Sequence, residues 1–164
     1  MSKVNPKYQT GFRLASTLDA DGIIWYPVEE AENIAIGDVV SLVSGEGYAE
    51  DGATSFAGGA TRTLGIAAAN ADNTSGSDGD ISVPVIPFRP HYRFWAPVGN
   101  DAIVSQADVG LMFDLHADNS LDSADTTCLY YGFLVEAIDI STAAVAANAY
   151  GYVLGRILTT PDEA

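Results

Sequence analysis

Histidine and cysteine, which often supply nucleophiles and metal ligands, are scarce and widely spaced in this sequence. His91 and His116 are the only histidines, and neither has a second histidine or a cysteine at the i+2 or i+4 spacing of a zinc site. Cys128 is the only cysteine, and the surrounding residues 126–131 include no cationic side chain that would activate a thiol. The pattern predicts a protein without enzymatic activity.

Acidic residues are abundant, but their spacing is more typical of turns than of ligand sets. Asp19-Ala20-Asp21-Gly22 is similar to the start of a calcium loop, yet Ile23 stands where an oxygen ligand belongs. Residues 118–122 lack the turn glycine and closing glutamate of such a loop, and residues 77–80 are typical of a solvated loop. Gly58-Gly59 lacks the lysine of a phosphate-binding loop. We therefore predict no bound metal and no cofactor.

Residues 88–95 form the densest mixture of aromatic and basic side chains in the chain. Aromatic residues and arginine dominate the energetic hot spots of protein interfaces. The candidate interface residues are Arg89, His91, Tyr92, Arg93 and Trp95. A core strand with arginines on its solvent face would have the same composition, because alternate residues of a strand point to opposite faces. The sequence leaves both interpretations open.

The net charge excludes several classes of partner. The chain has 22 acidic and 7 basic side chains, giving a formal net charge of −15. A surface of this sign repels nucleic-acid phosphates and anionic lipid headgroups, so we expect neither nucleic acid nor a membrane as a partner. The first residues lack the apolar stretch of a signal peptide, and no apolar run approaches the ~18 residues of a membrane span. We expect synthesis in the cytoplasm.

Residues 1–18 differ from the rest of the chain in charge, and we expect them to form an extended N-terminal arm. They carry three basic side chains and no acidic one, whereas residues 19–164 carry a net −18. Pro6 and Gly11 interrupt any regular period, and an arm of this kind is ordered only against a partner. Its candidate contact residues are Lys3, Lys7, Tyr8, Phe12 and Arg13.

Short β-branched and aromatic runs, separated by glycine, proline and aspartate-rich turns, predict an all-β fold. The expected strands are residues 23–28, 36–43, 45–50, 63–69, 81–87, 92–96, 107–115, 126–131, 132–138 and 151–158, and the second and third of these are expected to form a hairpin. Prolines in the strand 81–87 predict that it lies away from a sheet centre. Residues 70–80 are expected to form an exposed loop, and residues 141–148 a loop with one helical turn at most.

Strands at this spacing predict a small β-barrel or a β-sandwich with long loops. The length allows one sizeable core or two small β subdomains. We expect an arm over residues 1–18, a barrel-like subdomain over residues 19–88, and a second β subdomain over residues 89–164 that packs on the first or interleaves with it.

Three stretches of the chain share a pattern of short glycine-containing or valine-rich apolar segments. They are residues 35–42 (Ala-Ile-Gly-Asp-Val-Val-Ser-Leu), 63–67 (Thr-Leu-Gly-Ile-Ala) and 81–86 (Ile-Ser-Val-Pro-Val-Ile). In these stretches the chain resembles the small β-rich decoration, or cement, proteins of bacteriophage heads, including the lambda-type families. Residues 106–111 and 151–157 are similar to phage virion proteins of this kind, so the resemblance extends over most of residues 35–158.

The resemblance implies a β-tulip-like fold and a structural role in the virion. Proteins of this class bind the outer surface of mature capsids, commonly as trimers, and often grip coat subunits with an extended N-terminal segment. It therefore implies the phage major capsid protein as partner, a homotrimer, and a place on the capsid exterior. The arm residues would contact the capsid, and the residues between Arg89 and Trp95 would contact the capsid or a neighbouring subunit.

Two other functions agree with the same sequence. A soluble carbohydrate-binding β-sandwich would use Trp25, Trp95 and the tyrosines as platforms for sugar rings. It would be a monomer with these aromatic side chains exposed in a groove, whereas a cement protein would oligomerise and bind assembled shells. A phage tail or fibre component is the third class.

Overall fold

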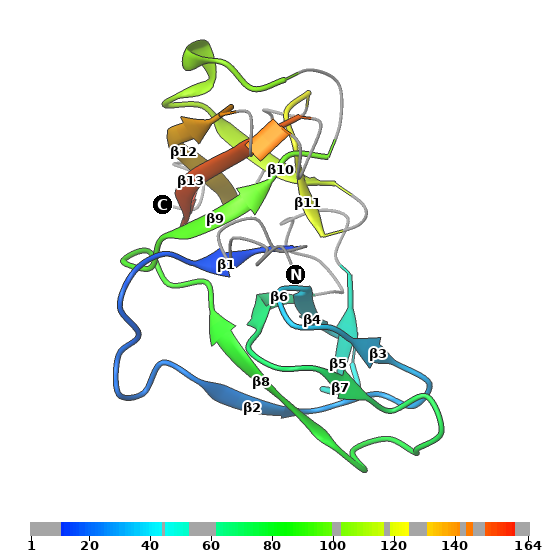
Figure 1. Ribbon diagram of the computed structural model, residues 1–164. Helices are drawn as coiled ribbons and strands as arrows, with labels where there is room; N and C mark the ends of the chain where they lie inside the picture. The colour runs from blue at the N-terminus through cyan, green and yellow to red at the C-terminus, as the bar shows by residue number, and fades with distance from the viewer. Residues whose placement is uncertain are drawn as a thin grey trace, which may run out of the picture.

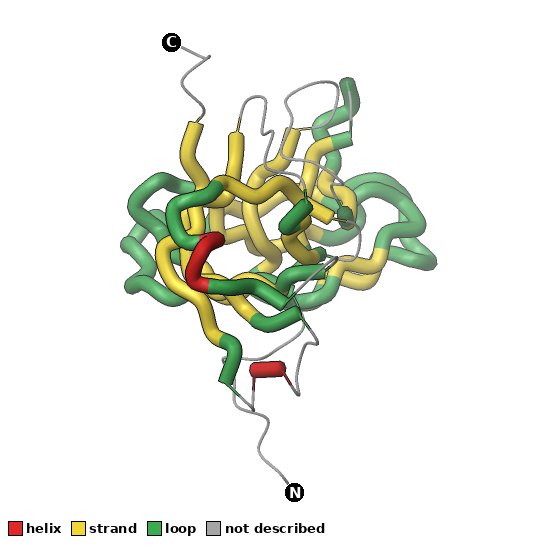
Figure 2. Tube along the Cα trace, turned by 90° about the horizontal axis from the view of Figure 1, so that it is seen from above, coloured by secondary structure: helices red, strands yellow, loops and turns green. Residues whose placement is uncertain are grey.

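The computed structural model describes residues 11–43, 45–52, 62–99, 103–116, 119–124, 131–141, 144–145 and 150–159. The fold is all-β, as predicted, and consists of three antiparallel sheets (Figure 1). The predicted barrel is wrong, because none of the three sheets closes on itself within the described ranges. Seen from above, the strands gather at the centre and the loops lie around them (Figure 2).

Two larger sheets and one small one make up the structure. The six-stranded sheet contains, in spatial order, β1 (Arg13–Leu14), β9 (Phe94–Pro97), β13 (Tyr152–Thr159), β12 (Tyr131–Asp139), β10 (Met112–His116) and β11 (Ser120–Asp122). The five-stranded sheet contains β2 (Ile24–Pro27), β8 (Ser82–Pro87), β6 (Arg62–Ala67), β4 (Val39–Leu42) and β5 (Ala49–Asp51). The small sheet pairs β3 (Asn33–Ile34) with β7 (Ala71–Asp72), and η2 (Gln106–Asp108) is a 3₁₀ turn before β10.

The hairpin predicted over residues 36–50 is confirmed as β4 and β5. Leu42 pairs with Ala49 in an antiparallel register. Gly45 and Gly47 in the connecting turn have φ angles of 80° and 81°, a left-handed conformation that glycine adopts without steric cost. The two glycines of the turn therefore favour the pairing of β4 with β5, which are adjacent in the sequence.

The prolines of β8 do not confine it to a sheet edge: it is an inner strand between the outer strand β2 and the central strand β6, so it lies away from the centre, as predicted, but is paired on both sides. The carbonyl of Pro84 accepts a hydrogen bond from the backbone N–H of Ala68 at 2.8 Å, just past the end of β6 at Ala67. The N–H that Pro84 lacks would point to this same side, where the pairing with β6 ends. The sheet therefore loses little by having a proline there.

Residues 70–80 contribute more to the structure than the predicted exposed loop. Residues 71–72 form β7, and Asn73 is buried. The Asn73 side-chain amide donates hydrogen bonds to the carbonyls of Val28 at 3.2 Å, Glu29 at 2.8 Å and Ser77 at 3.0 Å. An asparagine that satisfies three carbonyls can be buried at little cost, so it fastens this segment to the end of β2.

The expected arm over residues 1–18 is wrong for residues 11–18, which belong to the folded body. Arg13 and Leu14 form β1 and pair with Trp95 and Phe94 of β9. Phe12 is 3% exposed, and its backbone N–H donates to the carbonyl of Gly37 at 2.8 Å. Lys3, Lys7 and Tyr8 lie outside the described residues.

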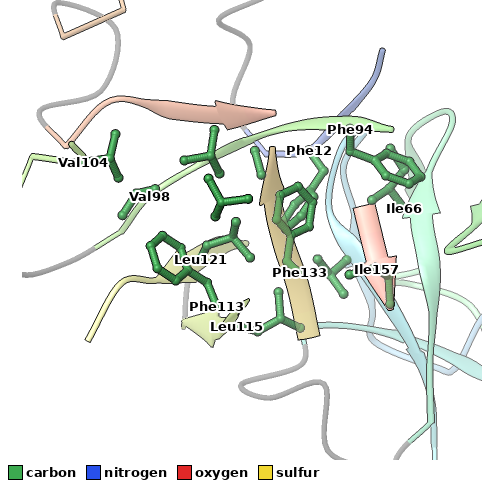
Figure 3. Close-up of a cluster of buried hydrophobic side chains, with 14 of the residues drawn as sticks. Phe12, Ile66, Phe94, Val98, Val104, Phe113, Leu115, Leu121, Phe133 and Ile157 are labelled. Atoms are coloured by element: carbon green, nitrogen blue, oxygen red, sulfur yellow. The ribbon is translucent and has the colours of Figure 1, made fainter. Parts of the chain in front are cut away.

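The two larger sheets share one apolar core (Figure 3). Val39 and Ile66 of the five-stranded sheet pack in the same cluster as Phe94 and Phe133 of the six-stranded sheet. A second cluster, which includes Val40, Ala67, Val83 and Val85, lies on the other face of the five-stranded sheet and includes Ile34 and Ala71 of the small sheet. The boundary expected after residue 88 separates the strands of the five-stranded sheet from those of the six-stranded sheet, except for β1. The division into two subdomains, packed on each other or interleaved, stays a prediction.

Substituting Phe12 distinguishes a packed segment from a free arm. We expect Phe12→Ala to lower the free energy of unfolding by about 3–5 kcal/mol, because it removes a buried ring and leaves a cavity. Ile36→Ala, at a side chain that is 52% exposed, is the matched control and should change stability by less than about 0.5 kcal/mol. Urea denaturation measures both, and a Phe12→Ala variant as stable as the parent would return residues 11–14 to the arm.

Candidate protein-interaction surface

The predicted interface residues between Arg89 and Trp95 lie around the turn that joins β8 to β9. The backbone N–H of Tyr92 donates to the carbonyl of Arg89 at 2.9 Å, which closes the turn. His91 and Arg93 are exposed and Arg89 is half-buried, whereas Tyr92 is fully buried and Trp95 is half-buried on β9. Tyr92 is therefore a core residue, and its proposed role as an interface contact is wrong for this conformation.

The basic side chains of this turn contact acidic groups of the same chain. His91 Nε2 lies 2.8 Å from Asp19 Oδ2, and Arg89 Nη1 lies 4.0 Å from the same oxygen. The hydrogen bond with His91, supported by one from Tyr92 and by the charge of Arg89, lowers the pKa of Asp19. Arg89 also donates to the carbonyl of Asp21 at 3.2 Å. These contacts fasten the turn at residues 19–22 to the β8–β9 turn.

A second set of ion pairs uses the remaining predicted arginine. Arg93 Nε donates to Glu136 Oε2 at 2.6 Å, and Arg156 Nε lies 3.0 Å from Glu136 Oε1 without hydrogen-bond geometry. Pairs that are as exposed as these stabilise a fold by about 1 kcal/mol at most. These ion pairs do offset the positive charge of Arg93. The basic side chains predicted between Arg89 and Trp95 are therefore largely neutralised by acids of the same chain.

Within the described ranges, three consecutive exposed apolar side chains lie instead on β2 and the residue before it. Ile23 is 40% exposed, Ile24 37% and Trp25 65%. The sequence predicts Trp25 as a sugar platform in the carbohydrate-binding alternative, and Ile23 and Ile24 are not among its candidate site residues. The available signal was three consecutive large apolar residues close to a proline, since consecutive apolar residues on an edge strand cannot all face the core.

Carboxylates gather next to the end of β2. Burial raises the pKa of Glu29, and the nearby charges of Glu50, Glu32, Glu46 and Asp78 raise it further. The backbone N–H of Glu29 donates to the carbonyl of Ala49 on β5, which brings this segment beside the β4–β5 hairpin. The apolar surface at residues 23–25 thus ends in a strongly acidic region.

A partly buried carboxylate lies where the two larger sheets meet. Burial raises the pKa of Asp38 to about 6, and the charge of Asp51 adds to the shift, although a hydrogen bond from the Ala35 N–H at 2.7 Å opposes it. Asn119, from the β10–β11 turn, accepts from the Val39 N–H at 2.6 Å and donates to Asp51 at 3.3 Å. This asparagine links the six-stranded sheet to β4 and β5.

The acidic motifs of the sequence form turns where the structure describes them. The Gly22 N–H donates to the Asp19 carbonyl at 3.0 Å, and Asp80 Oδ2 accepts from the Ser77 N–H at 2.8 Å. Within the described ranges, no three His, Cys, Asp or Glu side chains are arranged to hold a metal ion. In the same ranges no helix has the length and apolar character to cross a membrane. Cys128 lies outside them.

Comparison of the chain with protein-family models, curated proteins and solved structures gives no match. The resemblance to phage decoration proteins therefore depends on the sequence stretches alone. The structure places those three stretches largely on β4, β6 and β8, which are adjacent strands of the five-stranded sheet.

The position of Asp38 predicts a pH-dependent stability. Its pKa is raised on folding, so its ionised form destabilises the folded state above pH 6, and this penalty fades as the pH falls towards the ordinary value of 3.8. We expect Asp38→Asn to be more stable than the parent at pH 8, by about 1 kcal/mol after allowance for its half-exposed position. The difference should close near pH 4.

Thermal unfolding from pH 8 to pH 4 measures this difference. Asp21→Asn, on the exposed turn before β2, is the control and should give a difference that does not vary in this way. A destabilised Asp38→Asn variant at pH 8 would contradict the argument and indicate that the carboxylate stabilises this junction.

Proposed function

We propose that this protein is a non-enzymatic structural component of a phage virion that binds the outer surface of the assembled capsid and stabilises it. The observation that carries the proposal is the exposed apolar run at residues 23–25, which lies on an edge strand of a strongly acidic chain. Large apolar side chains gathered on a surface are typical of protein-binding sites. The sequence resemblance supplies the identity of the partner, the major capsid protein.

The N-terminal segment is the second proposed contact, in a shorter form than the sequence predicted. Because Phe12 belongs to the core and Arg13 to β1, the proposed arm is confined to residues 1–10, which lie outside the described residues. Lys3 and Lys7 supply positive charge and Tyr8 supplies an apolar anchor for an acidic groove of the coat lattice. One short arm binds weakly, but the arms of an oligomer act together through their effective concentration.

A homotrimer is part of the proposal, and a second exposed apolar region supports self-association. Ile103 and Ile140 are both exposed. The N–H of Val104 donates to the carbonyl of Tyr150, and Gly151 lies close to both Val104 and Ile140, so these isoleucines border the same end of the six-stranded sheet. Contact between copies would bury them.

Carbohydrate binding is the second candidate, and the exposure of Trp25 favours it specifically. A tryptophan that is 65% exposed can stack on a sugar ring. The half-buried Trp95 does not offer a comparable platform. A monomer that binds glycans through Trp25 and ignores capsids would favour this function.

Oligomeric state is the first test of the proposal. Because exposed isoleucines favour self-association, we expect light scattering at micromolar concentration to show a mass of three chains of 17.2 kDa each. If the protein is a monomer in solution, we expect it to be bound as trimers on the capsid. Ile140→Asp should weaken the trimer, whereas the control Ile36→Asp should not. A protein that stays monomeric both alone and on capsids contradicts the trimer.

Deletion of residues 2–10 tests the arm. We expect the truncated protein to fold normally by circular dichroism and to bind undecorated capsids at least tenfold more weakly, because three arms contribute to the avidity. Raising the salt concentration should weaken the parent more than the truncated protein, since the arm contact is electrostatic. Equal binding by both proteins would move the capsid contact to the folded body.

A further inference from the structure

The outer edge of β2 has unused backbone hydrogen-bonding groups. Pro84 of β8 directs its carbonyl to Ala68, on the β6 side, so its partner across the register, Trp25, directs its N–H and C=O away from β8. The residues of β2 that bond to β8 are Ile24 and Tyr26. Among the described residues, no strand pairs with this outer edge.

The other outer strands of the two larger sheets are engaged. On β5, the carbonyl of Ala49 accepts from Glu29. On β11, the carbonyl of Leu121 accepts from Gly99. Beside the two-residue β1, the N–H of Phe12 donates to Gly37. The bond from Glu29 and the parallel bridge between Val28 and Ala49 also occupy the outer side just past the end of β2, so among the described residues the open part of the β2 edge is residues 23–25.

Both faces of this edge are apolar. The side chains of Ile23 and Trp25 point to one face of the sheet and that of Ile24 to the other, because neighbouring residues of a strand alternate. All three are exposed. A strand added here would gain backbone hydrogen bonds and apolar contacts on both of its faces, which is the usual basis of strand addition to a sheet edge.

The charges at the two ends of the edge are unequal. Glu29 and Glu30 follow β2, and the Glu30 N–H donates to Asp78 at 2.8 Å, which brings a third carboxylate to this end. At the other end, Asp19 is paired with His91 and Arg89. An added strand is therefore favoured if it carries lysine or arginine at the end that meets Glu29.

Charge also argues against β2 of a second copy as the occupant. An antiparallel pair of β2 strands centred on Trp25 would place Glu29 of one copy opposite Asp21 of the other. Like charges directly opposite each other destabilise a strand pair. The edge thus favours a basic partner strand over its own copy.

We propose that the outer edge of β2 receives an extended segment of the coat subunit as an added strand, apolar in its centre and basic at the end beside Glu29, Glu30 and Asp78. This inference rests on the proposed capsid-binding function and names the contact. The added strand would place a backbone carbonyl opposite the Trp25 N–H and apolar side chains against Ile23 and Ile24.

A pair of variants at one position tests the edge on undecorated capsids. Trp25→Pro removes the outward N–H and the indole but no hydrogen bond to β8, and proline is tolerated on an edge strand. Trp25→Thr removes the indole and keeps the N–H. We expect both to weaken capsid binding, Trp25→Pro by tenfold or more and Trp25→Thr by less, with unchanged circular dichroism.

Capsid binding separates failure of the edge from failure of the function. Parent-level binding by Trp25→Pro would overturn the edge and leave the capsid function intact. A parent protein that binds no capsids would overturn the proposed function. Strand addition at the β2 edge would then be tested by hydrogen exchange with synthetic peptides alone.

Two synthetic peptides test the chemistry of the edge without capsids. The probes are Lys-Lys-Thr-Val-Thr-Val-Ser and the same peptide with two glutamates in place of the lysines. Hydrogen exchange followed by NMR should show that the basic peptide slows exchange of the Trp25 amide and that the acidic peptide does not. The amides of Ile24 and Tyr26, already bonded to β8, are internal controls.

Three results of the exchange experiment would overturn the proposal. Unchanged exchange of the Trp25 amide with both peptides would show that the edge takes no strand. Slow exchange without peptide that rises on deletion of residues 2–10 would identify the chain's own N-terminal segment as the occupant. Slow exchange that depends on protein concentration would identify a second copy.

Discussion

The packing of four phenylalanine rings between two open sheets is the interaction on which the rest of this structure depends. Phe12 lies 5.8 Å from Phe88 and 5.9 Å from Phe133 between ring centroids, and Phe88 lies 5.2 Å from Phe94, all edge to face. Such pairs add about 0.5–1.5 kcal/mol each to the burial of the rings. The rings come from the segment before β1, the β8–β9 link, β9 and β12. Val39 and Ile66 of the five-stranded sheet pack in the same cluster, so the rings join the two sheets.

The same packing determines which charged groups remain on the surface. With Phe88 and Tyr92 turned inward, the intervening Arg89 and His91 must turn towards solvent, where the Asp19 carboxylate meets them. On the neighbouring strands, Arg93 and Arg156 both approach Glu136. Arg89, Arg93 and Arg156 are thus paired with acids of the same chain, and acidic side chains are in excess over the whole sequence. This favours a basic or neutral partner protein and disfavours any phosphate-rich one.

Local signals in the sequence predict the longer strands but miss the short strands β1, β3, β7 and β11, and contacts between distant segments are out of their reach. The glycines at 45 and 47 and the β-branched run 39–42 identify the β4–β5 hairpin because turn and strand are adjacent in the chain. Nothing local to Phe12 indicates that its backbone bonds to Gly37, so the sequence alone places it in a free arm. For the candidate site, the sequence predicts the aromatic and basic residue types. It does not predict the inward direction of Tyr92 or the open edge of β2, because both depend on the order of the strands in the sheets.

An exposed apolar edge is a liability, and the local sequence of β2 limits it. The strand has four residues, and Pro27 at its end removes one donor from the outer edge. The carboxylates of Glu29 and Glu30 repel an identical edge that approaches in the antiparallel sense. A short edge with acid at one end therefore resists growth into larger sheets and still accepts a strand of opposite charge. Selectivity of this kind agrees with the proposed capsid binding, which requires a protein that stays dispersed at high concentration and then binds many equivalent positions on a preassembled surface.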